Sequence, residues 1–192
     1  MNVADIKSRL EKEFTAVAIQ IVNEGLVLKL EDLPRVALFL KDSPEFKMNY
    51  LSSITAVDYL EYLESVYHLY SVEKRTGPVI LRVRVPRDNP KIPSLVQIFR
   101  GAEFQESEAY DMMGIVYEGH PDLRRIFMWE GFEGFPLRKD YLAEDEDVLE
   151  WEDVEWLERH GVGVPEEYKV FARQLKESGK EARAQKPTEK EL

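Results

Sequence analysis

The sequence predicts an α+β fold: a mainly antiparallel sheet with helices packed on one face, followed by an extended C-terminal arm and tail. Three observations predict it. Apolar residues recur at helical spacing in segments such as 3–14, but alternate with polar residues in 79–86. Turn-forming residues separate several short β-rich segments. Beyond residue 115 the periodic pattern stops, and glycines and prolines become frequent.

The N-terminal quarter predicts a helix, a hairpin and a second helix. Four apolar residues recur at steps of three and four and predict an amphipathic helix: Val3, Ile6, Leu10 and Phe14. The β-rich segments 16–22 and 26–30 flank a turn at 23–25, which is typical of a hairpin. Asp32 precedes Leu33-Pro34 and predicts a capped helix that runs to about Lys41.

Three further strands are predicted over 51–59, 65–74 and 79–86, with a turn at 76–78 between the last two. In the last strand, apolar residues alternate with Arg82 and Arg84, so one face of the sheet is expected to be buried and the other at least partly exposed to solvent.

The core ends with two predicted helices. Ser94 can cap a short helix through Phe99, and a second helix over 102–113 ends at Gly114. The predicted organisation is a core domain, a docking arm, an acidic tail with helices and a disordered end, over the ranges 1–115, 116–142, 143–178 and 179–192.

Composition narrows the function classes. The absence of cysteine excludes disulfides, Cys-ligated zinc and iron–sulfur clusters held by this chain. A net charge of −11 repels phosphates and disfavours nucleic acid as a partner. No apolar run is long enough to span a bilayer, and the N-terminus lacks a signal-peptide core, so we expect a soluble intracellular protein. The 33% of charged residues, with only nine Asn and Gln, is a bias found in hyperthermophiles.

Residues 106–140 are the part of the chain richest in side chains that could act in catalysis or bind a metal. Glu106, Glu108, Asp111 and His120 are candidates for a general base or for metal ligands, which would indicate a metal-dependent hydrolase. The HExxH, GxSxG and P-loop patterns are absent, however, and no second histidine lies near His120.

The same residues also fit an electrostatic latch, in which the acidic face of the 102–113 helix binds arginines of the following segment. A long irregular segment in a compact protein is usually functional. This one carries many apolar residues that either cover the chain's own core or dock on another protein. The residues predicted to dock are Phe127, Met128, Trp129, Phe132, Phe135, Pro136, Leu137, Arg138, Lys139, Asp140 and Tyr141.

Two runs in this region strongly resemble a known family: E-x-E-x-Y-D-M-M-G-I-x-Y-x-G-H-P-x-L-R-R at 106–125 and G-F-P-L-R-K-D-Y at 134–141. They are similar to the C subunit of NADH:quinone oxidoreductase (respiratory complex I) and to its counterparts in membrane-bound [NiFe] hydrogenases and related archaeal energy-converting complexes. The resemblance covers roughly residues 5–141.

The resemblance implies a subunit with no catalytic residues and no bound cofactor. The iron–sulfur clusters, and a NiFe or quinone site, would belong to partner subunits: a hydrogenase-large-subunit-like protein and the iron–sulfur subunits. It further implies a peripheral place on the cytoplasmic side of the membrane. The motif positions with an implied structural role are Glu106, Glu108, Asp111, Gly114, His120, Pro121, Arg124 and Arg125.

Two positions depart from the family pattern. Ser107 stands where the pattern has arginine, and Phe135 where it has histidine. Together with the thermophile-like composition, they favour a ferredoxin-linked hydrogenase-like or sulfur-linked archaeal complex over a respiratory NADH:quinone oxidoreductase. A stand-alone hydrolase, and a soluble adaptor that docks through the acidic segment 143–158, stay open as alternatives.

Overall fold

The computed structural model describes residues 2–14, 17–129, 131–141 and most of 151–177, the exceptions in the last range being 160, 162, 165, 167, 168, 171 and 175. The chain divides into two compact units, Met1–Leu142 and Ala143–Leu192. The first unit therefore holds both the predicted core and the predicted arm.

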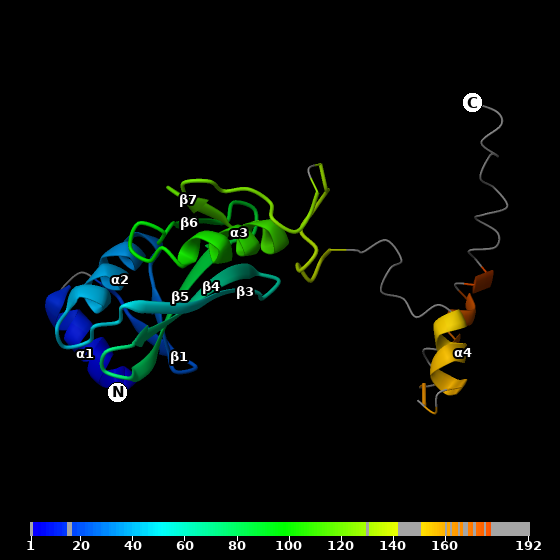
Figure 1. Cartoon of the computed structure of the whole chain (residues 1–192), viewed down its shortest axis with the longest axis horizontal. Coiled ribbons are helices and arrows are strands. Elements are labelled where there is room, and N and C mark those ends of the chain that lie inside the picture. Colours follow the sequence, from blue (N-terminus) through cyan, green and yellow to red (C-terminus); the bar gives the residue numbers. More distant parts are fainter. Residues whose placement is uncertain are drawn as a thin grey trace. The chain divides into compact units, whose positions relative to one another are not determined.

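The first unit is built on a five-stranded sheet in the order β1-β2-β5-β4-β3 (Figure 1). Its strands are β1 (Gln20–Val22), β2 (Gly25–Leu28), β3 (Tyr50–Asp58), β4 (Tyr62–Ser71) and β5 (Thr76–Pro86). Only the β2–β5 pair is parallel, and the other three pairs are antiparallel. The α+β class and the mainly antiparallel sheet are confirmed.

The predicted hairpin forms with a two-residue turn. Asn23 and Glu24 both have positive φ angles, 46° and 61°, and Gly25 already belongs to β2. Two successive residues with positive φ are typical of the turns whose twist matches that of the adjoining strands.

Three helices surround the apolar core: α1 (Val3–Glu13), α2 (Leu33–Asp42) and α3 (Ala102–Met113). The predicted stripe of α1 contributes Ile6 and Leu10, which are fully buried. On β5 the alternate residues Val79, Leu81, Val83 and Val85 are buried as predicted, whereas Arg82 and Arg84 lie on the other face and bind Glu64. A single apolar cluster joins this face to all three helices.

Two turn and helix predictions were wrong. The turn between β4 and β5 lies at 72–75, because Ser71 pairs with Thr76 and residues 76–78 belong to β5. Residues 94–99 form a turn and not a helix. The amides of Ile98 and Phe99 both donate to the carbonyl of Leu95, which closes a single turn. The hydroxyl of Ser94 accepts the amide of Val96 and donates to Glu106.

Asp32 does not cap α2 as predicted. A short 3-10 helix, Leu30–Asp32, leads into α2, and the carboxylate of Asp32 binds Arg35 at 2.5 Å instead of a backbone amide. The helix still begins at Leu33, with Pro34 in its first turn.

A second, two-stranded sheet was not predicted. Strand β6 (Lys91–Pro93) pairs in parallel with β7 (Val116–Glu118), which follows α3. Three-residue strands leave almost no periodic signal in a sequence. They place the start of the arm beside the proline-rich segment after β5, and Ile92 and Tyr117 are buried there.

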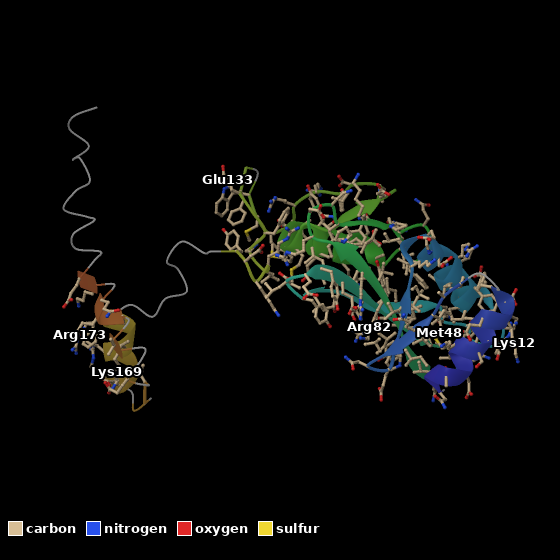
Figure 2. The ribbon with its side chains drawn as sticks, turned by 180° about the vertical axis from the view of Figure 1, so that it is seen from behind. Lys12, Met48, Arg82, Glu133, Lys169 and Arg173 are labelled. Atoms are coloured by element: carbon tan, nitrogen blue, oxygen red, sulfur yellow. The ribbon has the colours of Figure 1, made fainter. Side chains whose placement is uncertain are left out.

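The second unit contains helix α4 (Trp151–Arg159) and further helical residues between 166 and 177. Its buried apolar residues are Val154, Val164 and Ala172, and the guanidinium of Arg173 lies 4.8 Å from the centre of the Trp151 ring (Figure 2). The predicted helices over 143–158 and 165–178 are thus found in part. Residues 143–150 and the predicted disordered end, 179–192, lie outside the described residues.

Candidate functional site

A single buried carboxylate holds residues 126–128 of the arm. Asp111, in the last turn of α3, is fully buried, and its Oδ2 accepts the amides of Ile126, Phe127 and Met128 at 2.9, 2.7 and 3.0 Å. Three successive amides that point at one oxygen form an anion-binding concavity of the kind that turns present. The carboxylate therefore fixes the backbone of three arm residues at once.

The charge of Asp111 is balanced by Arg125, whose Nη1 lies 3.0 Å from Oδ1. Burial by itself raises the pKa of Asp111, but the three amides and Arg125 outweigh it and hold that pKa below its ordinary value. Asp111 is thus a stable carboxylate at neutral pH. The predicted latch between α3 and the arm exists at this pair.

Arg125 also reaches across the arm. Its Nη2 donates to the carbonyl of Gly134 at 3.0 Å, and its guanidinium lies 5.3 Å from the ring centre of Phe135 and 5.6 Å from that of Phe132. The Arg125 side chain therefore connects α3 to both sides of the bend in the arm, before and after residues 126–133.

The C-terminus of α3 supports the second half of the arm. Gly114 ends the helix with a φ of 73°, and the ring of Phe135 lies 2.5 Å from where a β-carbon at this position would be. The guanidinium of Arg138 lies 4.5 Å from the centre of the Phe135 ring, and its Nε donates to the carbonyl of Met113 at 2.7 Å. The amide of Leu137 also donates to the carbonyl of Met112 at 3.1 Å. The carbonyls of Met112 and Met113, which have no partner within the helix, therefore anchor the arm.

A second buried carboxylate, Asp58, holds the end of the arm. It lies at the end of β3 and accepts the amide of Lys139 at 2.8 Å as well as the guanidinium of Arg87. Arg87 in turn binds Asp140 at 2.6 Å. Sequence reasoning missed Asp58 and Arg87, although an aspartate at the end of a predicted strand is a signal that could have drawn attention to Asp58.

Glu106 is buried as well, but no arginine pairs with it. Its carboxylate accepts the hydroxyl of Ser94 at 2.6 Å and the amide of Leu95 at 2.7 Å. Burial raises its pKa above the ordinary value, against the lowering effect of these two bonds and of His120. Glu106 therefore holds the 94–95 segment against α3 and takes no part in the arm.

The pKa of Glu106 gives a testable pH dependence. Because the folded-state pKa lies above the unfolded one, the native state favours the protonated acid, and stability is lost as pH rises from about 4.5 through the raised value. In Glu106→Gln, an isosteric amide keeps an acceptor for Leu95 and carries no charge. We expect its melting temperature to fall less than that of the wild type between pH 4.5 and 7. Parallel melting curves across this range would contradict the prediction.

The remaining motif residues do not converge on one point. His120 uses both ring nitrogens: Nε2 lies 2.9 Å from the carbonyl oxygen of Glu103, and Nδ1 accepts the amide of Asp122 at 3.1 Å. Glu108 and Pro121 are exposed. Arg124 is also exposed and binds Asp122 at 2.9 Å, so the latch does not include it.

These contacts weigh against the hydrolase. Asp111, Glu106 and His120 each bind a different part of the backbone. In the part of the chain that the structure describes, no group of three or more His, Asp or Glu side chains is placed to hold a metal ion.

The held arm displays large apolar side chains. Phe127, Trp129 and Leu137 are 61%, 68% and 58% exposed, and Phe104 on the adjacent helix α3 is 71% exposed. We call the three arm residues Phe127, Trp129 and Leu137 the apolar arm surface. Phe104 was not among the predicted docking residues, because its helical spacing did not distinguish it from a core position. Figure 2 shows Glu133 at the tip of the arm, at the opposite end of the first unit from Lys12 on α1.

Other aromatic residues support this surface from within the arm. Phe132 packs edge-on against Trp129, with ring centres 4.7 Å apart, and stacks with Tyr141 at 6.1 Å. Edge-to-face and offset stacks are the favoured arrangements of such rings. The exposed side chains therefore rest on an ordered base.

A model of the family "Respiratory-chain NADH dehydrogenase, 30 Kd subunit" matches residues 26–147, which is more than half of the chain. The chain belongs to this family. The match includes the two motif runs, α3 and the whole arm, and so confirms the resemblance found in the sequence.

Similar proteins agree. The NADH-quinone oxidoreductase C subunit of Chlorobium phaeobacteroides is 45% identical over 121 residues, which cover 62% of this chain and 73% of that protein. The corresponding protein of Herpetosiphon aurantiacus is 37% identical over 80% of this chain and 92% of its own length. A chain of an archaeal membrane-bound sulfane sulfur reductase shares the fold, with a TM-score of 0.58 and 22% identity over 83% of this chain and 91% of that one.

None of the helices formed by the described residues has the length and apolar character that crossing a membrane requires.

Proposed function

We propose that this chain is a non-catalytic subunit of a complex I-related, energy-converting membrane oxidoreductase, and that it docks on its partners through the apolar arm surface. The observation that carries this proposal is the combination of a firmly anchored arm with exposed aromatic side chains. Family membership supports the assignment to such a complex, and the exposed aromatic side chains of the anchored arm support the proposed docking role.

Anchoring matters because flexible loops lose affinity when they become ordered on binding. Asp111 fixes residues 126–128 of the arm, the end of α3 fixes residues 137 and 138, and Asp58 fixes residue 139. The apolar arm surface is therefore largely formed before the partner arrives, and tryptophan and phenylalanine supply large contact areas with few rotatable bonds.

The partners we propose are the subunit that carries the quinone or NiFe site and the neighbouring iron–sulfur subunits. Electron transfer falls steeply with distance, so a rigid clasp that keeps these subunits in register supports catalysis without chemistry of its own. In this arrangement the chain binds no cofactor and lies peripherally on the cytoplasmic side of the membrane.

The relatives favour a quinone-reducing complex within this class, since those at 45% identity are subunits of quinone oxidoreductases. The sequence departures at Ser107 and Phe135 point instead to a hydrogenase-like or sulfur-linked complex. In the structure Ser107 is buried and the Phe135 ring contacts two arginines, Arg125 and Arg138, so both side chains pack within the chain itself.

A tagged copy of the full chain, isolated from its native membranes in mild detergent, tests the proposal. We expect a multi-subunit complex that contains iron. Nickel would identify a hydrogenase-like member, and a quinone-binding subunit without nickel would identify the respiratory type. Recovery of the chain without partners would overturn the proposal. Loss of partners on deletion of 143–192, with no loss in arm variants, would support the adaptor instead.

Substitution of the exposed aromatics makes the test specific. We expect Phe127→Ser combined with Trp129→Ser to lower the recovery of partner subunits about tenfold or more, because buried aromatic anchors dominate interfaces. The stability of the isolated chain should change by less than about 1 kcal/mol, since both side chains are largely exposed. Val72→Ser, at a position 65% exposed on the β4–β5 turn, is the matched control and should retain the partners.

A further inference from the structure

The turn between β3 and β4 displays a leucine in an unfavourable conformation. Leu60 has a φ of 68° and is 57% exposed. Glycine and asparagine adopt this backbone region readily, whereas leucine does so at a cost in free energy. The exposed side chain adds no stabilisation to the isolated chain. A turn between two strands needs neither a leucine at positive φ nor an exposed apolar side chain, so Leu60 serves something other than the stability of the fold.

The side chains around Leu60 form an ordered platform. Tyr59 and Tyr62 stack with ring centres 4.9 Å apart and an interplanar angle of 21°. The guanidinium of Arg84, on β5, lies 5.0 Å above the Tyr62 ring. Contacts of this kind restrict the rotamers before any partner binds, which lowers the entropic cost of docking.

The turn and the arm share one anchor. The Oδ1 of Asp58 accepts the amide of Leu60 at 2.7 Å, and its Oδ2 accepts the amide of Lys139 at 2.8 Å. Two segments far apart in sequence are thus held by opposite oxygens of a single carboxylate that is 3% exposed. The β3–β4 turn and the end of the arm therefore form one continuous surface.

The charge beside Leu60 indicates what this surface meets. Within the described residues, the ammonium of Lys139 makes no ion pair or hydrogen bond, although its backbone is held by Asp58. A lysine whose backbone amide shares the Asp58 carboxylate with that of the exposed Leu60 fits an apolar pocket that carries a carboxylate on its border.

We infer that the β3–β4 turn is a second docking element, in which Leu60 enters an apolar pocket of the partner complex and Lys139 faces a carboxylate at the border of that pocket. This inference rests on the proposed function, because the partner is the same complex that the arm binds. It adds a contact on a different structural element, which the apolar arm surface does not include.

The decisive variant is Leu60→Gly, because its two expected effects have opposite signs. Glycine removes the side chain and adopts a φ of 68° without strain, so the melting temperature of the isolated full chain should stay equal or rise. Recovery of partner subunits from native membranes should fall about tenfold. Leu60→Asn, which tolerates the same backbone region, should act alike and guards against loosening of the turn by glycine.

Val72→Ser again serves as the control, and the Phe127 and Trp129 double variant runs beside it. Full recovery of partners with Leu60→Gly and Leu60→Asn overturns the inference. If the double variant loses its partners at the same time, the proposed function stands and only the role of the turn is refuted. Loss of partners with the Leu60 variants alone supports the turn and refutes docking by the arm.

Discussion

Asp111→Ala is expected to lower the free energy of unfolding by about 3–5 kcal/mol, because it leaves Arg125 and three arm amides without their buried partner. The loss of native structure should be confined to the arm. We therefore expect the amides of Ile126, Phe127 and Met128 to lose protection in hydrogen exchange, while amides of the interior strand β4 keep theirs. Urea unfolding and residue-resolved exchange measure the two effects.

Glu108→Ala is the matched control for Asp111. It removes a carboxylate from the same helix, one turn earlier, at an exposed position. We expect its free energy of unfolding to stay within about 0.5 kcal/mol of the wild type. Unchanged exchange at residues 126–128 in Asp111→Ala would show that this carboxylate does not anchor the arm.

The second large effect is expected for Gly114→Ala. A β-carbon at this position would lie 2.5 Å from the Phe135 ring and 2.8 Å from the Arg138 guanidinium, in a backbone region with φ of 73° that alanine adopts at a cost. Strain and overpacking together should lower the free energy of unfolding by about 2–4 kcal/mol. Chemical denaturation of the full chain measures it.

Two other glycines separate the two causes. Gly119 has a φ of 84° but open space around it, so Gly119→Ala reports backbone strain alone. Gly101 has neither a positive φ nor a close neighbour, since the nearest atom, the carbonyl oxygen of Leu51, is 3.9 Å from a β-carbon there. We expect the order Gly114, Gly119, Gly101 from most to least destabilised. If Gly114→Ala costs no more than Gly119→Ala, the Phe135 ring does not pack against the helix end as described.

Sequence patterns correctly predicted the features that depend only on residues close together in the chain. The helix over 102–113 and its end at Gly114 were predicted from spacing and from one glycine, and α3 has these bounds. The alternation along β5 predicted correctly which side chains enter the core. The short strands β6 and β7 were missed because their pairing depends on where the chain returns, which three residues cannot encode.

The arm shows the same division at the candidate site. Its composition predicts that residues 116–142 are a docking arm, and the pair of Asp111 with Arg125 agrees with the predicted latch. Arg124, its neighbour, was given the same implied role from the motif and is instead exposed. Adjacent arginines are equivalent in a sequence, and only the direction of the backbone decides which one turns inward.

The sequence by itself determined the family, the α+β class, the strand faces and the ends of α3, because each depends on residue types at fixed short spacings. Only the tertiary structure decided the partners of the carboxylates: Asp111 with three arm amides, Glu106 with Ser94 and Leu95, and Asp58 with both Leu60 and Lys139. Asp58 and Lys139 are 81 positions apart. A buried carboxylate binds whatever donors the folded chain brings within about 3 Å of it, and that proximity is a property of the whole chain path.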